Sequence, residues 1–121
     1  MVSHGLKMLS KKNRLNKKRD FENVFRKGKS FKEDLLLLKI TEGKTSQSRF
    51  GLIVSKKISK KATIRNKLKR RISELVGKEI KNLPKSMDIV IVTFPGIEKK
   101  DFLEIEKIIK KLFKKVTLFQ S

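Results

Sequence analysis

Apolar residues in the first half of the chain predict one helix followed by three strands. Phe21, Val24 and Phe25 share one helical face, Asn16 is placed to cap the start of that helix, and Gly28 is placed to end it. The three strands are expected at residues 29–32, 35–40 and 49–55, the first as a short edge strand. The polar segment 43–48 is expected to be a hairpin loop between the second and third strands.

The second half of the chain predicts a helix, a strand and a helix. The central helix should run from Ala62 to just before Leu83, because Leu83 precedes a proline and such residues disfavour helix. Its apolar stripe consists of Ile64, Leu68, Ile72, Leu75, Val76 and Ile80. A strand follows at 87–94, and Asp101 and Glu104 are spaced as a cap pair for the last helix. That helix has an apolar stripe of Phe102, Ile105, Ile108, Ile109, Leu112, Phe113 and Val116.

The order of elements, α-β-β-β-α-β-α, predicts an α+β fold with a single domain. One four-stranded sheet is expected to be packed with helices on one face and to be partly open on the other. The strand, central helix and strand also suggest a crossover between parallel neighbours, for which the general rule predicts a right-handed connection. Residues 1–12 are lysine-rich without periodic apolar positions, so we expect a basic tail before a folded domain at 13–121.

The charge of the chain points to a polyanionic partner. Its 33 Lys and Arg residues against 12 Asp and Glu residues give a formal net charge of +21, far more than solubility requires. The absence of cysteine excludes disulfides and thiolate metal sites, and the one histidine, His4, lies in the expected tail. No apolar run approaches the ~20 residues of a membrane span, and no secretion signal is present, so a cytoplasmic protein without membrane contact is expected.

The cations concentrate in residues 55–71, which hold nine Lys or Arg side chains and no carboxylate. A solvated helix face is the ordinary explanation of a charge run, but such a face normally mixes signs, so this stretch predicts a nucleic-acid surface. Phe21 and Phe25 have two interpretations, core packing or a platform for unpaired bases. The candidate RNA-binding residues are Arg14, Lys56, Lys57, Arg65, Asn66, Lys67, Lys69, Arg70 and Arg71.

Two blocks of sequence resemble the protein subunit of bacterial ribonuclease P. The first includes Arg14-Leu15 and RDFENVFRKGKS at 19–30, and the second includes RFGLIVSKK at 49–57, Ala62, residues 65–67 and residues 69–70. Two positions depart from the family pattern. Lys67 replaces the last residue of its Arg-Asn-Arg signature and loses a planar fork that grips phosphate, and Ser73 stands where the family often has another arginine.

The resemblance implies that the protein assists an enzyme whose catalyst is RNA. In the family, the RNA subunit uses Mg²⁺ to hydrolyse the 5′ leader from precursor tRNA, while the protein binds ribonuclease P RNA and holds the leader. One protein per RNA is then expected, with no catalytic residue, metal or cofactor on the protein itself. The resemblance places Arg65, Asn66, Lys67, Lys69 and Arg70 against RNA. It places the leader in a cleft between the sheet and the central helix, lined by Phe21, Phe25, Leu37, Lys39 and Ile53. It also implies a left-handed crossover, as in a ribosomal-protein domain.

Three other functions compete with this interpretation. A ribosomal protein or RNA chaperone without a role in cleavage fits the composition equally well. A protein-only nuclease would need clustered carboxylates or a histidine acid and base, but the acidic residues are scattered and each has an ordinary surface, cap or turn role: Asp20, Glu22, Glu33, Asp34 and Asp88. A membrane-surface protein would need interfacial aromatic residues, which the basic helix lacks.

Overall fold

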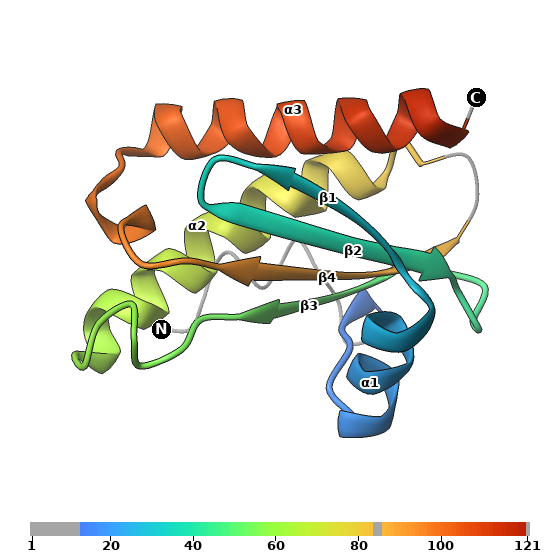
Figure 1. Ribbon diagram of the computed structural model, residues 1–121, viewed down its shortest axis with the longest axis horizontal. Coiled ribbons are helices and arrows are strands. Elements are labelled where there is room, and N and C mark those ends of the chain that lie inside the picture. Colours follow the sequence, from blue (N-terminus) through green and yellow to red (C-terminus); the bar gives the residue numbers. More distant parts are fainter. Residues whose placement is uncertain (1–12, 84–85, 121) are drawn as a thin grey trace.

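The computed structural model describes residues 13–83 and 86–120, so the expected tail at 1–12 lies outside the described residues. The elements are α1 (Lys18–Lys27), β1 (Lys29–Glu33), β2 (Leu36–Glu42), β3 (Arg49–Ile53), α2 (Ala62–Ile80), β4 (Met87–Thr93), the short 3-10 helix η3 (Ile97–Lys99) and α3 (Phe102–Gln120). Figure 1 shows α2 and α3 as long helices beside one sheet and α1 as a shorter helix. The predicted order of helices and strands is confirmed.

The four strands are arranged β1-β2-β4-β3. β4 lies antiparallel to β2 and parallel to β3, so the hairpin predicted across 43–48 is wrong: β2 and β3 are separated by β4. The last strand takes the central position because it is the most apolar and is buried on both faces. The true hairpin joins β1 to β2 through a turn at Asp34 and Leu35. Asp34 has a φ of 53°, a conformation that aspartate tolerates better than most residues.

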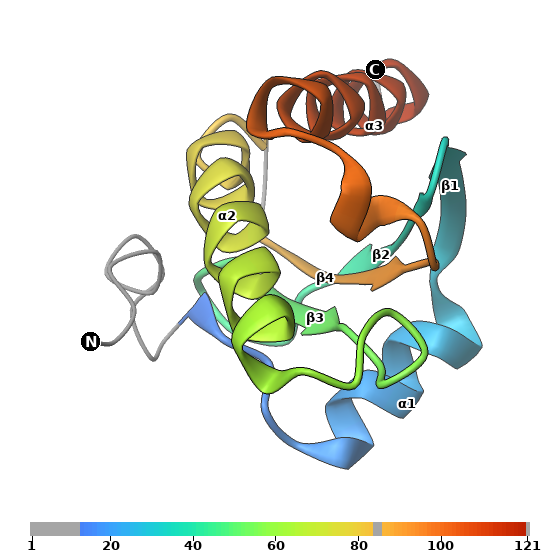
Figure 2. The same ribbon diagram turned by 90° about the vertical axis from the view of Figure 1, so that its left-hand side faces the viewer.

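The β3-α2-β4 crossover is left-handed. Figure 1 shows α2 behind the sheet, and the turned view in Figure 2 shows it to the left of the strands. The path from β3 through α2 to β4 therefore turns in the uncommon sense. The hand implied by the family resemblance is therefore confirmed, and the general rule fails. A right-handed connection would place α2 on the opposite face, where the polar side chains of Lys39, Arg49 and Asp88 interrupt the apolar surface.

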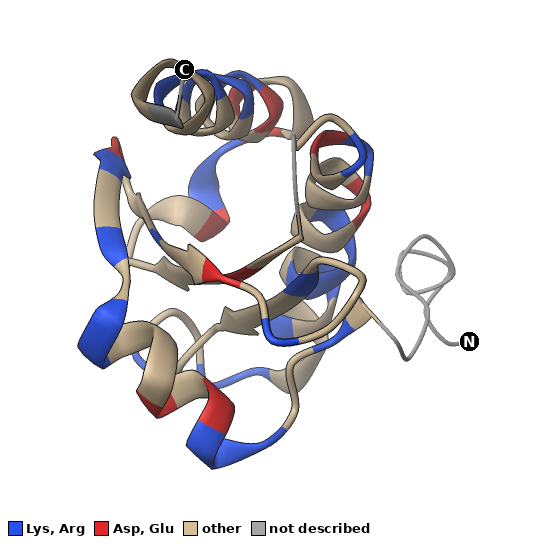
Figure 3. Ribbon diagram, turned by 90° about the vertical axis from the view of Figure 1, so that its right-hand side faces the viewer, with Lys and Arg blue, Asp and Glu red and all other residues tan. Residues whose placement is uncertain are grey.

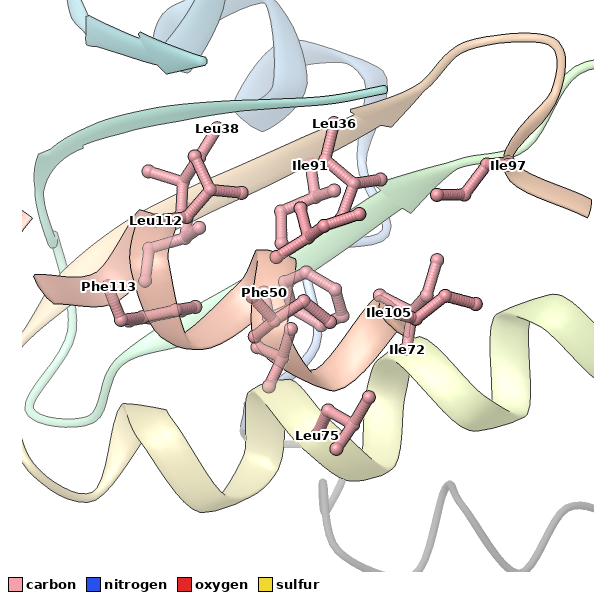
Figure 4. Packing of buried hydrophobic residues seen from close by; sticks show 14 of the residues in the cluster. Leu36, Leu38, Phe50, Ile72, Leu75, Ile91, Ile97, Ile105, Leu112 and Phe113 are labelled. Atoms are coloured by element: carbon pink, nitrogen blue, oxygen red, sulfur yellow. The ribbon is translucent and has the colours of Figure 1, made fainter. Parts of the chain in front are cut away.

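The main core lies between the sheet and the pair α2 and α3. Side chains alternate across each strand, so Leu36 and Leu38 of β2 and Ile91 of β4 point into this core and are completely buried. Figure 4 shows them packed with Ile72 and other side chains of α2 and α3. The predicted stripes of these helices are confirmed except at their first positions, where Ile64 is 37% and Phe102 is 36% exposed.

A smaller apolar cluster joins α1 to the other face of the sheet. Its buried members are Leu15, Val24 and Val90. The cap predicted at Asn16 is wrong, because Lys17 occupies the N-cap position and makes no side-chain cap bond. The cap pair at α3 is confirmed: the backbone N–H of Glu104 donates to Asp101 Oδ1 at 2.8 Å, and that of Asp101 donates to Glu104 Oε1 at 2.9 Å.

Candidate nucleic-acid interface

The first half of α2 presents cations to solvent. Asn66, Lys67, Lys69 and Arg70 are exposed, while Arg65 and Arg71 are half-buried. Arg65 is held in place because its Nη1 donates to the backbone oxygen of Ser59 at 2.8 Å. Figure 3 shows that Lys and Arg positions extend over all three helices while Asp and Glu positions are few.

The N-terminus of α2 is unusually positive. Its N-cap is Lys61, no side chain caps it, and the first turn contains no acidic residue. The helix dipole already places a partial positive charge there, so lysines at this end are unfavourable until an anion approaches. A phosphate group would relieve this repulsion and accept bonds from free backbone N–H groups.

The turn between β3 and α2 carries Lys56 and Lys57 on an ordered backbone. Ile58 is buried and anchors the turn to the main core. The backbone N–H of Lys57 donates to Ser55 Oγ at 3.2 Å, and that of Lys61 donates to Ser59 Oγ at 3.1 Å. The serines of this turn therefore have a structural role, and the lysines stay exposed.

Arg14 lies beside the outer edge of β3. It forms an isolated parallel bridge with Phe50, and the next backbone N–H, of Leu15, donates to the Phe50 oxygen at 2.9 Å. Arg14 is half-buried. The segment before α1 thus closes one sheet edge and places a cation at the border between the two faces of the sheet.

The five residues expected to line the leader cleft belong to one region. Leu37 and Ile53 both pair with Val92 of β4, which puts their side chains in one row on the face of the sheet that carries α1. Lys39 stands on the same face, two residues along β2. We call this surface, made of Phe21, Phe25, Leu37, Lys39 and Ile53, the α1 face.

The position expected for the cleft needs a correction. The apolar stripe of α2 packs on the opposite side of the sheet, with Leu36, Leu38 and Ile91. The residues of the α1 face therefore lie between the sheet and α1 rather than between the sheet and the central helix. Strand alternation gives the reason, because residues 37, 39 and 53 have the opposite parity to the core positions of their strands.

The two phenylalanines of α1 differ in environment. Phe21 is half-buried and its ring lies against the backbone of β3: a Cβ added at Gly51 would be 2.4 Å from Phe21 Cζ. Phe25 is 37% exposed, and the Lys39 ammonium stands 5.7 Å from its ring centroid. The packing interpretation fits Phe21, which lies on the sheet, while Phe25 has an open ring beside a cation. A platform for unpaired bases stays a prediction for both.

Sequence reasoning missed two further features of this face. Val92 stands between Leu37 and Ile53 and is half-buried, as the alternation of β4 could have indicated. Beyond it the Lys32 ammonium lies 5.1 Å from the centroid of the Phe94 ring. The α1 face is thus a half-exposed apolar surface with lysines at its border.

The most important residue that sequence reasoning missed is Arg49. Its Nε and Nη2 donate to the two carboxylate oxygens of Asp88 at 3.0 and 2.8 Å, and its Nη1 donates to Asp20 Oδ2 at 3.3 Å. The hydrogen bonds with Asp88 raise the pKa of Arg49. Asp88 is only 1% exposed, so the ordinary surface, cap or turn role expected for it is wrong. The available signal was a lone carboxylate within the apolar strand Met87–Thr93.

No candidate metal centre is found among residues 13–83 and 86–120. Within these ranges no three His, Cys, Asp or Glu side chains are grouped so that they could hold a metal ion. Asp20 and Asp88 share the Arg49 guanidinium instead. None of the helices in the described part of the chain is both long and apolar enough to span a membrane.

The fold and its cationic surface define a small basic α+β protein with a left-handed crossover. Comparison with known proteins identifies the family, since the model of the ribonuclease P protein family, described as "Ribonuclease P", matches residues 9–117. The chain belongs to the family of bacterial ribonuclease P protein components.

Individual relatives agree with this assignment. The chain is 38% identical over 112 residues to the ribonuclease P protein component of Syntrophomonas wolfei, covering 93% of each chain. It is 36% identical to that of Bacillus velezensis, covering 93% of this chain and 97% of the relative. The solved ribonuclease P protein of Thermotoga maritima aligns with a TM-score of 0.74 at 31% identity, over 84% of this chain and 96% of that one. The Staphylococcus aureus structure gives 0.77 at 28%, over 86% and 94%.

Proposed function

We propose that the protein binds ribonuclease P RNA through the cationic side of α2 and holds the 5′ leader of precursor tRNA on the α1 face. It thereby assists endonucleolytic removal of the leader in the cytoplasm. The RNA subunit performs the hydrolysis with Mg²⁺, one protein serves each RNA, and the protein itself supplies no catalytic group or cofactor. The observation that carries the proposal is the α1 face, where half-exposed aromatic and aliphatic side chains lie beside Lys39.

The α1 face suits unpaired RNA of variable sequence. Aromatic and aliphatic surfaces accept any base, because every base has a flat apolar face, and each stacked base contributes about 1–3 kcal/mol. Cations at the border attract the backbone without reading sequence. Precursor and mature tRNA differ by the leader alone, so one stacked base gives a preference for precursor of about tenfold, since 1.4 kcal/mol corresponds to that factor.

The cationic side of α2 suits the phosphates of a structured RNA. Its residues come from a helix fixed by the main core, and none of the residues from 55 to 73 is acidic. Arg65 and Arg70 can each donate two bonds to one phosphate, whereas Lys67 and Lys69 act as point charges. Binding through this surface is expected to weaken steeply as salt concentration rises.

Cleavage at limiting Mg²⁺ tests the proposal as a whole. A bacterial ribonuclease P RNA is assayed on a precursor tRNA with this protein, and an unrelated protein of similar charge serves as the control. We expect only this protein to restore cleavage, and Arg65→Ala to restore less. Equal rescue by the control protein would reduce the function to general RNA binding.

Phe21→Ala tests the role of the α1 face separately. Affinities of the assembled protein–RNA complex are measured for precursor and mature tRNA. We expect the variant to weaken precursor binding about tenfold, the value of one stacked base, and to leave mature tRNA binding unchanged. An equal loss for both substrates would remove Phe21 from the leader site.

A further inference from the structure

We infer that Arg49, through its shared contact with Asp20 and Asp88, positions α1 for leader binding and so acts as a positioning residue for substrate selection. This inference rests on the proposed function of the α1 face and identifies what holds that face in shape. The Arg49 guanidinium takes no part in cleavage and, in our proposal, does not contact the RNA.

Helix α1 has little apolar anchorage of its own. Among its ten residues, Asn23 and Val24 are buried; Val24 belongs to the cluster with Leu15 and Val90, and the half-buried Phe21 packs against that cluster. Apolar contact is non-directional, so two such side chains within one turn constrain the position of a ten-residue helix more than its orientation. Orientation must come from directional contacts.

Arg49 supplies a directional contact at the start of the helix. Its two bonds to Asp88, which is 1% exposed, fix the guanidinium plane relative to β3 and β4. The remaining Nη1 then points to Asp20 Oδ2 at 3.3 Å. Asp20 directly precedes Phe21, so the ion pair sets the height at which the Phe21 ring meets the sheet.

Lys39 supplies a second contact at the end of the helix. Its Nζ donates to the backbone oxygen of Phe25 at 3.2 Å, where the helix dipole favours a cation. The two phenylalanines of the α1 face therefore lie beside the two polar tethers of the helix. Gly51 makes the arrangement sensitive to small shifts, because the Phe21 ring fills the space that a side chain at Gly51 would need.

Asp20→Asn tests the contact between Arg49 and Asp20 separately from the buried pair of Arg49 and Asp88. Asparagine keeps the size of aspartate but removes the charge that Arg49 Nη1 contacts, and the bonds between Arg49 and Asp88 stay in place. Glu22→Gln is the matched control, since Glu22 lies on the same helix, is exposed, and loses the same charge. Both variants raise the net charge by one, so any general gain in RNA attraction is equal.

The readout is the ratio of affinities for precursor and mature tRNA, measured with the assembled protein–RNA complex. We expect Asp20→Asn to lower this ratio about two- to fivefold, the size expected for one partly exposed ion pair, and Glu22→Gln to leave it unchanged. Affinity for ribonuclease P RNA should be the same for both. Gly51→Ala, which displaces the Phe21 ring with every charge kept, should lower the ratio as well.

The outcomes separate this inference from the proposed function. If Phe21→Ala lowers the ratio but Asp20→Asn matches Glu22→Gln, the positioning role is overturned and the leader site stands. If Phe21→Ala has no effect on the ratio, the leader site itself is overturned and the inference with it. If Asp20→Asn weakens precursor and mature tRNA equally, the ion pair supports the fold in general, which also overturns the positioning role.

Discussion

The two faces of the sheet are held by different forces. On the side of α2 and α3, twenty buried apolar residues of the described chain form one cluster, whereas on the side of α1 the buried cluster has three. The first face fixes a helix whose cations project to solvent. The second leaves apolar side chains half-exposed and fixes its helix with charged tethers. The protein thus presents charge on a helix held by a large apolar core, and apolar surface beside a helix held by a small cluster and by polar contacts.

Adjacent residues of β4 test this comparison most strongly. Ile91 points into the main core and Val90 into the α1 cluster, and both are completely buried. We expect Ile91→Ala to lower the free energy of unfolding by about 2–5 kcal/mol, and Val90→Ala by about 2 kcal/mol from two lost methyl groups. Chemical denaturation of the free protein measures both. Where both variants still fold, the preference of the complex for precursor over mature tRNA should fall for Val90→Ala and stay unchanged for Ile91→Ala. An equal fall for both variants would contradict the separate roles of the two faces.

A smaller effect sharpens the role of α2. Lys67→Arg introduces a planar fork on the rigid helix, so we expect affinity for ribonuclease P RNA to rise by about two- to fivefold, because charge-assisted bidentate bonds are stronger than single ones. Precursor preference should not change. Lys44→Arg, at an exposed position of the 43–48 segment, is the control. Titration of labelled ribonuclease P RNA at one fixed salt concentration measures the affinity of each variant. If Lys67→Arg binds no more tightly than Lys44→Arg, residue 67 does not contact a phosphate.

The smallest effect concerns the edge of the sheet. Lys115 Nζ lies 2.8 Å from Glu33 Oε1, and this hydrogen bond lowers the pKa of the Glu33 carboxyl below its ordinary 4.5. Because the pKa of Glu33 is lower in the folded protein than in the unfolded chain, its pair with Lys115 contributes to the free energy of unfolding above pH 4.5. This contribution is lost as the pH falls through the pKa of the folded protein. Thermal midpoints of the protein and of Glu33→Gln should therefore differ slightly at neutral pH and converge in acid. A difference that persists unchanged at low pH would exclude this pair as its cause.

The sequence identified the elements because their apolar periods are strong, but it could not identify neighbours. Periodicity places β2 and β3 in succession along the chain and says nothing about a later strand entering between them. β4 takes this place because its successive side chains Ile89, Val90 and Ile91 point to opposite faces of the sheet, and a position inside the sheet buries all three. The apolar periodicity also could not predict the hand of the crossover. The helix α2 packs on the face of the sheet that lacks the polar side chains of Lys39, Arg49 and Asp88.

The candidate site was only partly predictable for a similar reason. The cations of α2 stand out in sequence, since they form a run without carboxylates. Arg49, Asp88 and Asp20 are separated by tens of residues, and no local pattern reveals that one guanidinium joins them. Ile64 fits the core stripe in sequence, yet it lies at the start of α2, where the helix extends past its apolar partners, and it remains 37% exposed.

The central position of β4 has a consequence for the order in which the protein forms during synthesis. When the chain has been made as far as α2, the hairpin of β1 and β2 has no third strand to pair with, and β3 lacks the strand that it adjoins in the finished sheet. Sheets that depend on distant segments form late. The most cationic segment, residues 55–71, therefore emerges from the ribosome before β4 completes the sheet on which α2 packs. A chain that stops before Met87 would remain an unfolded polycation, exposed both to proteases and to any RNA nearby.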